Sequence, residues 1–360
     1  MKTVSIIIPC KNEEKFIKNC IESVVAFEIP EGLNIEIFLV DGLSDDQTVS
    51  IVEKMIEHYP NTKIQLLVNQ KIYSSYAMNE ALKVANGDYI LRLDAHAVYP
   101  ENYLKECYQT SIRTCADNVG GLVKTLPGSD KFEGKLVQAL TTHKFGVGNS
   151  GFRVGMEEGN AETVPYGFFN KQLFNKIGYF DQRLVRAQDF EFNSRIHYFK
   201  GKVWLNPKIQ VTYFNQPDLA SFYKKQFYKE APYNAYMWKV APYSFTIRHG
   251  ITSVFTLGIF GGSILSFFSL YIKNAFLAVL VLYLTLAIIS AIQQARRFKE
   301  IWFILILPIC FFLFHFIHGL GLLIGLLKLA FKVSPVQKNE KPWDQARSIN
   351  TIEAVKLMNV

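Results

Sequence analysis

The chain is poor in cysteine: five cysteines occur among 360 residues, and no two of them form a C-x-x-C pair. This scarcity excludes a disulfide framework and a zinc site of the usual spacing, and it fits a reducing compartment. The chain also lacks a secretory signal at its start, because Met1-Lys2-Thr3 leads straight into the strand-like run Val4–Ile8. We therefore expect about the first 240 residues to stay in the cytosol.

Charged residues are missing from three long apolar runs, at 251–270, 275–292 and 301–327. Runs of this length match the hydrocarbon core of a bilayer, whereas helices of soluble proteins are rarely apolar on every face. The net charge of +8 and the aromatic content of 14% suit either a nucleic-acid binder or a membrane-bound protein. The basic residues surround the apolar runs without a recognition motif, so we expect a membrane partner and no nucleic acid. The sequence predicts a transmembrane region of about three spans at 251–330, followed by a polar tail at 331–360.

The orientation of these spans is only partly set by the charges. The basic loop Arg296–Lys299 is expected in the cytosol by the positive-inside rule. The run 301–327 is harder to place, because a helix of that length measures about 40 Å, too long for one upright span and too short for two. One crossing would also leave a lysine-bearing tail outside. A span followed by an interfacial or re-entrant segment at Gly319–Gly321 is an alternative, and the number of spans in this multi-pass protein of the cytoplasmic membrane stays open.

Strand-like and helix-like stretches alternate through the first 125 residues. Such alternation predicts βαβ units, and therefore an α/β domain with a Rossmann-like, mostly parallel sheet. In an open sheet of this type, ligands bind at the carboxyl ends of the strands. Polar residues follow the strands here: Pro9, Lys11 and Asn12; Asp41, Gly42 and Ser44; Asp94 and His96. The expected strands are Val4–Ile8, Ile35–Val40, Ile64–Val68 and Tyr89–Leu93, and the expected helices are Glu13–Val25, Gln47–His58 and Ser74–Ala85.

The regular alternation stops between residues 126 and 165. Its glycine-rich part, Gly146–Gly155, is typical of a mobile substrate loop. Helical patterns resume at Lys171–Ile177 and Asp189–Phe199, and the basic, aromatic stretch 216–249 is typical of a helix at the membrane surface. We expect these domain boundaries: a catalytic domain at 1–235 and an interfacial connector at 236–250.

Asp94 and His96 follow a strand-like run and stand two residues apart. In an extended backbone, residues i and i+2 point to the same side, so the carboxylate and the imidazole could face one divalent cation. Such oxygen and nitrogen ligands suit Mn²⁺ or Mg²⁺, which enzymes use to hold diphosphates. The alternative is a surface turn with a stray histidine.

Five motifs follow one another along the first part of the chain. They are Val4-Ser-Ile-Ile-Ile-Pro9-Cys-Lys-Asn12-Glu13-Glu14, Val40-Asp41-Gly-Leu-Ser44-Asp45-Asp46-Gln-Thr48, Leu93-Asp94-Ala-His96, Gly178-Tyr-Phe180-Asp181 and Gln188-Asp189-Phe-Glu191. In this order they resemble family 2 glycosyltransferases of GT-A fold, and within them the membrane-anchored succinoglycan-biosynthesis type, whose D-x-D motif is D-A-H. The resemblance covers about the first 250 residues and ends at Arg248-His249, before the first apolar run.

The resemblance implies which residues hold the nucleotide. Pro9, Asn12 and Glu13 would border the base, and Asp41 would bind the base or the ribose, since a carboxylate accepts from a base N–H and from ribose hydroxyls. The alternative is that Asp41–Ser44 is only a turn rich in turn-forming residues.

The resemblance also implies a metal and a diphosphate site. Asp94 would lie near the ribose and the metal, and His96 would take the second ligand position. The metal would offset the charge that builds on the nucleoside diphosphate as the glycosidic bond breaks. A histidine in place of an aspartate removes one negative charge from this site. Lys71 and Arg92 are further candidates for contacts with the diphosphate.

Asp189 is the candidate general base. Inverting transfer needs one carboxylate that takes the proton of the acceptor hydroxyl as this attacks the anomeric carbon. The family usually has a second acid before this residue, where this chain has Gln188, a candidate for acceptor or diphosphate contacts. Glu191 lies two positions further on and is expected to face elsewhere on a helix. The alternative for Asp189 is a helix N-cap.

Gln226 and Lys229 resemble part of the Q-x-x-R-W motif of processive family members, with Lys for Arg and Glu230 for Trp. They could meet the phosphate charge of the acceptor or the diphosphate. A solvated amphipathic helix on the membrane surface is the alternative.

These residues together predict an inverting, metal-dependent glycosyltransferase. It would move a sugar from a nucleoside-diphosphate sugar onto a polyprenyl-diphosphate-linked glycan in exopolysaccharide or capsule assembly. A UDP-sugar is the expected donor from the family's habit, with thymine or guanine as alternative bases. Two other interpretations stay open, a processive polysaccharide synthase and a catalytically silent glycan-binding scaffold.

Overall fold

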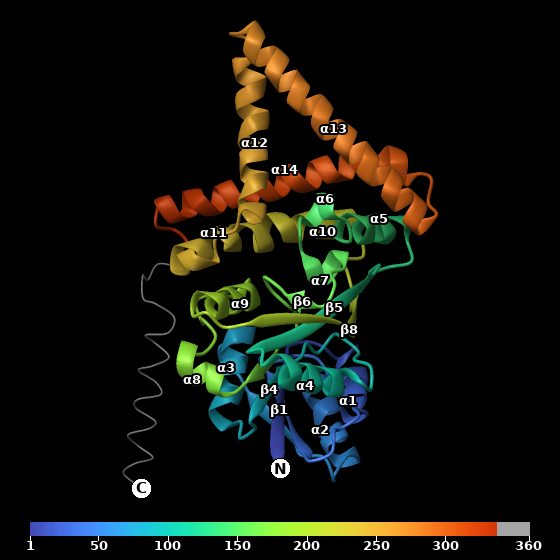
Figure 1. The fold of residues 1–360 in the computed structure, drawn as a ribbon, viewed down its shortest axis with the longest axis vertical. Helices are drawn as coiled ribbons and strands as arrows, with labels where there is room; N and C mark the ends of the chain where they lie inside the picture. The colour runs from blue at the N-terminus through green and yellow to red at the C-terminus, as the bar shows by residue number, and fades with distance from the viewer. Residues whose placement is uncertain (337–360) are drawn as a thin grey trace. The chain divides into compact units, whose positions relative to one another are not determined.

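The computed structural model describes residues 1–336 and divides the chain into two compact units (Figure 1). The chain enters the second unit twice, at 125–154 and again from 214 onward. The first unit contains 1–124 and 155–213. The predicted ends of the catalytic domain at residue 235 and of the connector at residue 250 stay predictions. The predicted polar tail lies outside the described residues from position 337 onward.

The first unit is built on an eight-stranded sheet with the order β3-β2-β1-β4-β7-β5-β8-β6. Its first half, β1 to β4, is parallel, as predicted. The other half is not, because β7 runs antiparallel to both of its neighbours and β6 antiparallel to β8. The sheet is therefore mixed. The strands are β1 (Lys2–Cys10), β2 (Leu33–Asp41), β3 (Ile64–Val68), β4 (Tyr89–Arg92), β5 (Asn118–Leu126), β6 (Gly159–Asn160), β7 (Phe168–Asn170) and β8 (Val203–Phe214).

The hydrophobic pattern explains the central position of β1. Ile6, Ile7 and Ile8 are all fully buried, as expected for a parallel strand that is covered on both faces. Helix α1 buries residues at positions i, i+3, i+4 and i+7 of one face, from Ile17 to Val24. The helices of this unit are α1 (Ile17–Val25), α2 (Thr48–His58), α3 (Ser74–Val84), α4 (Tyr103–Thr114), α8 (Gln172–Ile177) and α9 (Gln188–Tyr198).

The register of the parallel strands brings their carboxyl ends to one edge of the sheet. Cys10 at the end of β1 pairs with Asp41 at the end of β2, and Asp41 pairs with Val68 at the end of β3. Arg92 ends β4 opposite Ile7. The loops that follow these strands therefore leave from the same edge, which is where an open α/β sheet binds its ligands.

The second unit is helical. Residues Leu136, Val137 and Leu140 of α5 pack with Phe303 and Phe311 of α14 in its core. The expectation of an irregular segment at 126–165 is therefore wrong for residues 132–141, which form α5 and whose apolar residues have helical spacing. Two short helices, at 144–147 and 151–154, also occupy most of the glycine-rich stretch. The helices are α5 (Phe132–Thr141), α6 (Lys144–Val147), α7 (Gly151–Val154), α10 (Leu219–Lys225), the π-helix η1 (Gln226–Glu230), α11 (Ala231–Val240), the 3₁₀ turn η2 (Pro242–Ser244), α12 (Ile247–Leu265), α13 (Leu270–Phe298) and α14 (Phe303–Ala330).

Two helices among the described residues, α13 and α14, are long and apolar enough to cross a membrane. The first of the three predicted runs falls mostly in α12, which has 19 residues and begins with Ile247, Arg248 and His249. Helix α14 continues without a break through Gly319 and Gly321, which argues against a re-entrant segment there, while the interfacial alternative stays a prediction. Glycine is needed at Gly319 because another helix packs closely there: a Cβ on Gly319 would lie 2.1 Å from the carbonyl oxygen of Thr252.

Candidate active site

The loops after β1 and β2 are joined by hydrogen bonds between their backbones and side chains. Asn12 has a φ of 55°, and its backbone N–H donates to the hydroxyl of Ser44 at 2.9 Å. The Asn12 side chain accepts from the backbone N–H of Asp45 at 3.0 Å and donates to its carboxylate at 2.7 Å. Glu13 donates its backbone N–H to Thr48 at 2.7 Å. The first two sequence motifs therefore form one hydrogen-bonded rim at the edge of the sheet.

Asp41 lies at the end of β2 and is 4% exposed. One of its carboxylate oxygens accepts from the Ser44 backbone N–H at 3.0 Å, and the other accepts from the Ser44 hydroxyl at 2.5 Å. The turn alternative for Asp41 is therefore present in the structure, while its role in nucleotide binding stays a prediction. Pro9 lies inside β1, opposite Val40.

The loop after β3 carries Lys71 and lies against this rim. The backbone N–H of Asn69 donates to the Asp41 carbonyl at 2.7 Å. A Cβ on Gly42 would lie 2.8 Å from the carbonyl oxygen of Ile72, so the chain approaches as closely as it does only because residue 42 is glycine. Lys71 itself is exposed beside these loops.

The guanidinium of Arg92 joins two acidic residues from different motifs. Its Nη2 lies 2.8 Å from Oδ1 of Asp94, and its Nη1 lies 2.9 Å from Oδ2 of Asp189. The Arg92 side chain is only 7% exposed, whereas those of Asp94 and Asp189 are 25% and 36% exposed. Arg92 Nε is buried and has no partner among the described residues. A single cation thus gathers the D-A-H motif and the candidate base into one centre.

This arrangement sets the charge of the candidate base. Partial burial raises the pKa of Asp189, because removal from water disfavours the ionised carboxylate. Arg92 opposes this increase in the pKa of Asp189, and the negative charge of Asp94 adds to it. The same two carboxylates raise the pKa of Arg92, which keeps its guanidinium charged. Asp189 is therefore a carboxylate with an elevated pKa beside a permanent positive charge.

His96 lies beside Glu13, from the first motif. Its Nδ1 is 3.1 Å from Oε1 of Glu13, and the two side chains are 42% and 19% exposed. Within residues 1–336, no group of three or more histidine, cysteine, aspartate or glutamate side chains is placed to hold a metal ion. Asp94 and His96 alone would offer one oxygen and one nitrogen ligand. This donor set fits a metal whose other ligands are diphosphate oxygens and water, as is usual for Mg²⁺ in phosphate sites.

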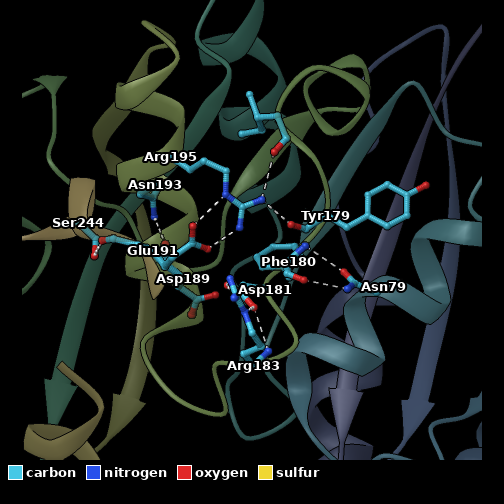
Figure 2. A network of polar contacts seen from close by, with 12 residues as sticks. Asn79, Tyr179, Phe180, Asp181, Arg183, Asp189, Glu191, Asn193, Arg195 and Ser244 are labelled. Carbon is cyan, nitrogen blue, oxygen red and sulfur yellow. Dashed lines mark hydrogen bonds and ion pairs between the residues drawn. The ribbon is translucent and has the colours of Figure 1, made fainter. Parts of the chain in front are cut away.

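The segment that leads to Asp189 is held in place by buried polar contacts (Figure 2). The Asn79 side chain donates to the Phe180 carbonyl at 2.9 Å and accepts from its backbone N–H at 3.0 Å. Arg195 donates to both carboxylate oxygens of Glu191, at 2.9 and 2.5 Å, and to the carbonyls of Ile177 and Tyr179. Arg195 and Glu191 are both fully buried. Glu191 thus faces the interior and away from Asp189, as the helical spacing suggests.

Asp189 does not act as a helix cap. Helix α9 is preceded by Ala187, which has a φ of 62°, and no side chain caps it by a hydrogen bond. Asp189 lies in the first turn, and its carboxylate points to Arg92 instead. Gln188 is the first residue of α9 and is half-buried.

Gln226 and Lys229 lie in η1 of the second unit. Lys229 is exposed and Gln226 is half-buried. Their proposed contacts with an acceptor or a diphosphate stay a prediction.

Several supporting residues were not found from the sequence. The hydroxyl of Tyr99 accepts from the backbone N–H of Asp94 at 2.8 Å and fixes the D-A-H turn. Arg195 follows Glu191 by four residues, and on a helix this spacing predicts an ion pair, so this contact could be predicted from the sequence. Asn79 gives no such signal, because its partner, the backbone of Phe180, is far away in sequence.

Comparisons with known proteins show which proteins the chain is similar to. Residues 5–178 match the family model described as glycosyl transferase family 2. The dolichyl N-acetyl-alpha-D-glucosaminyl phosphate 3-beta-D-2,3-diacetamido-2,3-dideoxy-beta-D-glucuronosyltransferase of Methanococcus voltae is 28% identical over 334 residues, which are 91% of this chain and 98% of that protein. The succinoglycan biosynthesis protein ExoA of Rhizobium meliloti is 28% identical over 224 residues, 62% of this chain and 66% of that protein.

A solved structure shares the fold. The mannosyltransferase PcManGT of Pyrobaculum calidifontis, in complex with GDP-Man and Mn²⁺, aligns with a TM-score of 0.55 over 92% of this chain and 88% of that one, at 17% sequence identity. The expected α/β fold of the GT-A type is confirmed. The chain is therefore a glycosyltransferase, and its residues 5–178 are similar to the glycosyl transferase family 2 model.

Proposed function

We propose that this glycosyltransferase catalyses an inverting, metal-dependent transfer of a sugar from a nucleoside-diphosphate sugar to a lipid-linked glycan acceptor at the membrane. The observation that carries the proposal is the guanidinium of Arg92, which holds Asp94 and Asp189 at 2.8 and 2.9 Å. The residue expected beside the metal and the donor, and the residue expected to activate the acceptor, thereby share one charged centre at the edge of the sheet.

The rim formed by the loops after β1 and β2 is the proposed nucleotide site. Asn12, Glu13 and Asp41 contribute to this rim, and the exposed Lys71 next to it supplies a positive charge for the diphosphate. A UDP-sugar is the first donor to test, and the GDP-Man bound by the Pyrobaculum enzyme makes a GDP-sugar the second.

Asp94 and His96 would hold the metal. A bound Mn²⁺ or Mg²⁺ supplies electrostatic stabilisation of the departing diphosphate. Glu13 has a separate role in this proposal, since a carboxylate at Nδ1 of a histidine fixes the tautomer that leaves Nε2 available as a ligand.

Asp189 would act as the general base. Its carboxylate takes the proton of an acceptor hydroxyl while the hydroxyl oxygen forms a bond to the anomeric carbon. The bond between that carbon and the diphosphate oxygen breaks in the same step, with the electron pair leaving on the diphosphate. Attack from the face opposite the leaving group inverts the anomeric configuration.

The lipid-linked acceptor is supported by the Methanococcus relative, whose name describes transfer to a dolichyl-phosphate-linked sugar and whose similarity extends over nearly the full length of this chain. It is also supported by the apolar helices α13 and α14, which would keep the enzyme where such lipids lie. Assembly of an exopolysaccharide is supported by the succinoglycan relative. A processive synthase would differ in the length of its product.

The proposal is tested by incubating membranes that contain the protein with UDP- and GDP-sugars and with a lipid extract. We expect one labelled lipid product of fixed size, formed only when Mn²⁺ or Mg²⁺ is present. Asp189→Asn should lose this product. The Asp130→Asn variant is its matched control and should keep the product, because Asp130 is an exposed aspartate of the second unit. Transfer to a soluble acceptor alone, with no lipid product, would contradict the lipid part of the proposal, and a ladder of long products would favour a synthase.

A further inference from the structure

Helix α14 contains the most extended apolar run of the sequence, but it is a poor candidate for a membrane span. In its most apolar stretch, 44% of the residues are buried within the protein, compared with 17% in α13. Its first half packs on Leu136 and Leu140 of α5 and on Phe222 of α10. Its second half lies on η1 and α11, since a Cβ on Gly321 would meet the carbonyl oxygen of Phe227 at 2.7 Å and one on Gly325 would meet the backbone of Pro232 at 2.8 Å.

Four of the elements that pack along α14 are charged. Each of them carries lysine: Lys135 in α5, Lys224 and Lys225 in α10, Lys229 in η1 and Lys239 in α11. If α14 crossed a bilayer, these helices would accompany it through the hydrocarbon core. Charged side chains are strongly disfavoured there, which argues against a crossing by α14.

The two other apolar helices have the opposite character. In α12 the only buried residue is Thr256. In α13 no residue before Ala287 is buried. Figure 1 shows α12 and α13 as a hairpin that projects away from α14, which runs crosswise at its base. Large apolar side chains are exposed along the hairpin: Val254, Leu257, Phe260, Ile264, Leu277, Val279, Val281, Leu282 and Leu284.

The dimensions and the ends of the hairpin match a bilayer. Residues 250–265 of α12, which follow Arg248 and His249, would span about 24 Å. Residues 270–286 of α13, before its first buried residue, would span about 26 Å, so both segments come near the thickness of the hydrocarbon core. The turn at the tip exposes Phe267, Phe268 and Tyr271 and carries Lys273, a mixture that suits the water–lipid interface. At the other end, α13 finishes with Arg296 and Arg297, which suit anionic headgroups.

We propose that α12 and α13 cross the bilayer as a hairpin and that α14 lies along the membrane surface without crossing it. The occupant of the exposed hairpin surface is then lipid hydrocarbon. The start of α12 and the end of α14 lie on one side of the membrane, together with Arg296, Arg297 and Lys328. A lysine-bearing tail would lie outside the cell only if the third apolar run crossed the membrane. With two crossings, by α12 and α13, this difficulty does not arise. The inference rests on the membrane association proposed above and not on the sugar-transfer chemistry.

The test uses single reporter cysteines and a membrane-impermeant maleimide on intact cells. Cys115 is the exposed native thiol, while the four others are buried, so Cys115→Ser is a suitable background. Reporters are placed at the tip (Asn274→Cys), between α13 and α14 (Ile301→Cys) and after α14 (Val333→Cys), at exposed positions. We expect Ile301→Cys and Val333→Cys to react under the same condition, either intact or permeabilised, and Asn274→Cys under the other.

Two outcomes overturn the proposal. Opposite behaviour of Ile301→Cys and Val333→Cys would mean that α14 crosses the membrane. Equal behaviour of all three reporters, with release of a soluble oligomer by alkaline carbonate, would mean that a second copy of the chain covers the hairpin. Because the readout is labelling, failure of the proposed sugar transfer would leave this result intact.

A matched pair of lysine substitutions gives an independent readout. Val281 in α13 and Ile309 in α14 are 64% and 62% exposed. Val281→Lys would put a charge into the hydrocarbon core, whereas the lysine of Ile309→Lys can reach the headgroups from a surface helix. We expect the membrane-bound fraction to fall clearly in Val281→Lys and to stay near that of the wild type in Ile309→Lys. A larger loss in Ile309→Lys would contradict the proposal.

Discussion

Arg92 Nη1 lies 2.9 Å from Oδ2 of Asp189, and this ion pair links the end of β4 to the first turn of α9. Arg92 directly precedes the D-A-H motif segment, and Asp189 belongs to a motif far away in sequence. Their pairing gives Arg92 a further role, because its guanidinium is shared between Asp189 and Asp94, while its contact with the diphosphate stays a prediction. Arg92 would set the charge and the position of the proposed base.

The pH dependence of activity follows from this pair. The pKa of Asp189 is raised above its ordinary value of 3.8 by burial, and Arg92 limits the increase. Because a carboxylate base works only when ionised, kcat/KM should fall as the pH drops through this raised pKa. Arg92→Gln removes the positive charge, so the acid limb should move to higher pH, by about 1–3 units. The pH profile of kcat/KM for lipid glycosylation measures this shift.

Arg92→Lys is the control for that prediction, since it keeps the charge while changing the geometry. Its acid limb should lie between those of the wild type and Arg92→Gln. A folded Arg92→Gln variant whose acid limb coincides with that of the wild type would show that the ion pair does not control the base.

Metal dependence should respond to Glu13 as well as to the proposed ligands. Glu13 contacts Nδ1 of His96 at 3.1 Å, and loss of a partner that orients a metal-binding histidine typically weakens metal affinity about 10–100-fold. We therefore expect Glu13→Gln to raise the Mn²⁺ concentration for half-maximal activity by that factor. Removal of metal with a chelator should abolish transfer in both proteins, and added Mn²⁺ should restore it. If Glu13 instead contacts only the nucleobase of the donor, Glu13→Gln would change the KM for the donor and leave the metal requirement unchanged.

The buried pair of Glu191 and Arg195 should contribute to stability more than an exposed pair. Arg195→Met leaves Glu191 buried without its partner, which destabilises a protein by about 3–5 kcal/mol. Arg113 pairs with Glu158 at the surface, where the Arg113 side chain is 58% exposed, and its replacement should change stability by about 0–1 kcal/mol. Denaturant unfolding of Arg195→Met and Arg113→Met in detergent measures both free energies. Equal effects would be inconsistent with the burial of Arg195.

The close approach of two loops at Gly42 should matter for donor binding. Gly42→Ala would place a Cβ 2.8 Å from the carbonyl oxygen of Ile72, so the Lys71 loop must shift. We expect a loss of stability of about 1–3 kcal/mol and a higher KM for the donor. Gly159→Ala is the control, because nothing lies within 4 Å of a Cβ there. An unchanged KM for the donor in Gly42→Ala would mean that the loop with Lys71 does not contribute to donor binding.

The sequence was sufficient for those parts of the fold that depend on local pattern. The parallel strands β1 to β4 could be predicted because their apolar runs alternate with amphipathic helices. The antiparallel placement of β7 between β4 and β5 could not, because β7 has only three residues and no pattern of its own. The same limit applies to α14, whose composition indicates a span, while its covering by charged helices becomes visible only in three dimensions.

The site shows a similar division. Asp94, His96 and Asp189 could be singled out because they stand in motifs whose order is informative. The contacts of Arg92 with two carboxylates and of Glu13 with His96 could not be predicted, because each joins residues of different loops. Gln226 and Lys229 remain untested, since they lie in the other unit.

The central claim is that Asp189 takes the proton of the acceptor. The most direct test is the single-turnover rate of sugar transfer by Asp189→Asn with donor and metal saturating, measured beside the Asp130→Asn control and beside donor affinity. We predict that Asp189→Asn transfers sugar about 10²–10⁴-fold more slowly while donor affinity stays near that of the wild type. A transfer rate in Asp189→Asn equal to that of Asp130→Asn would contradict the account.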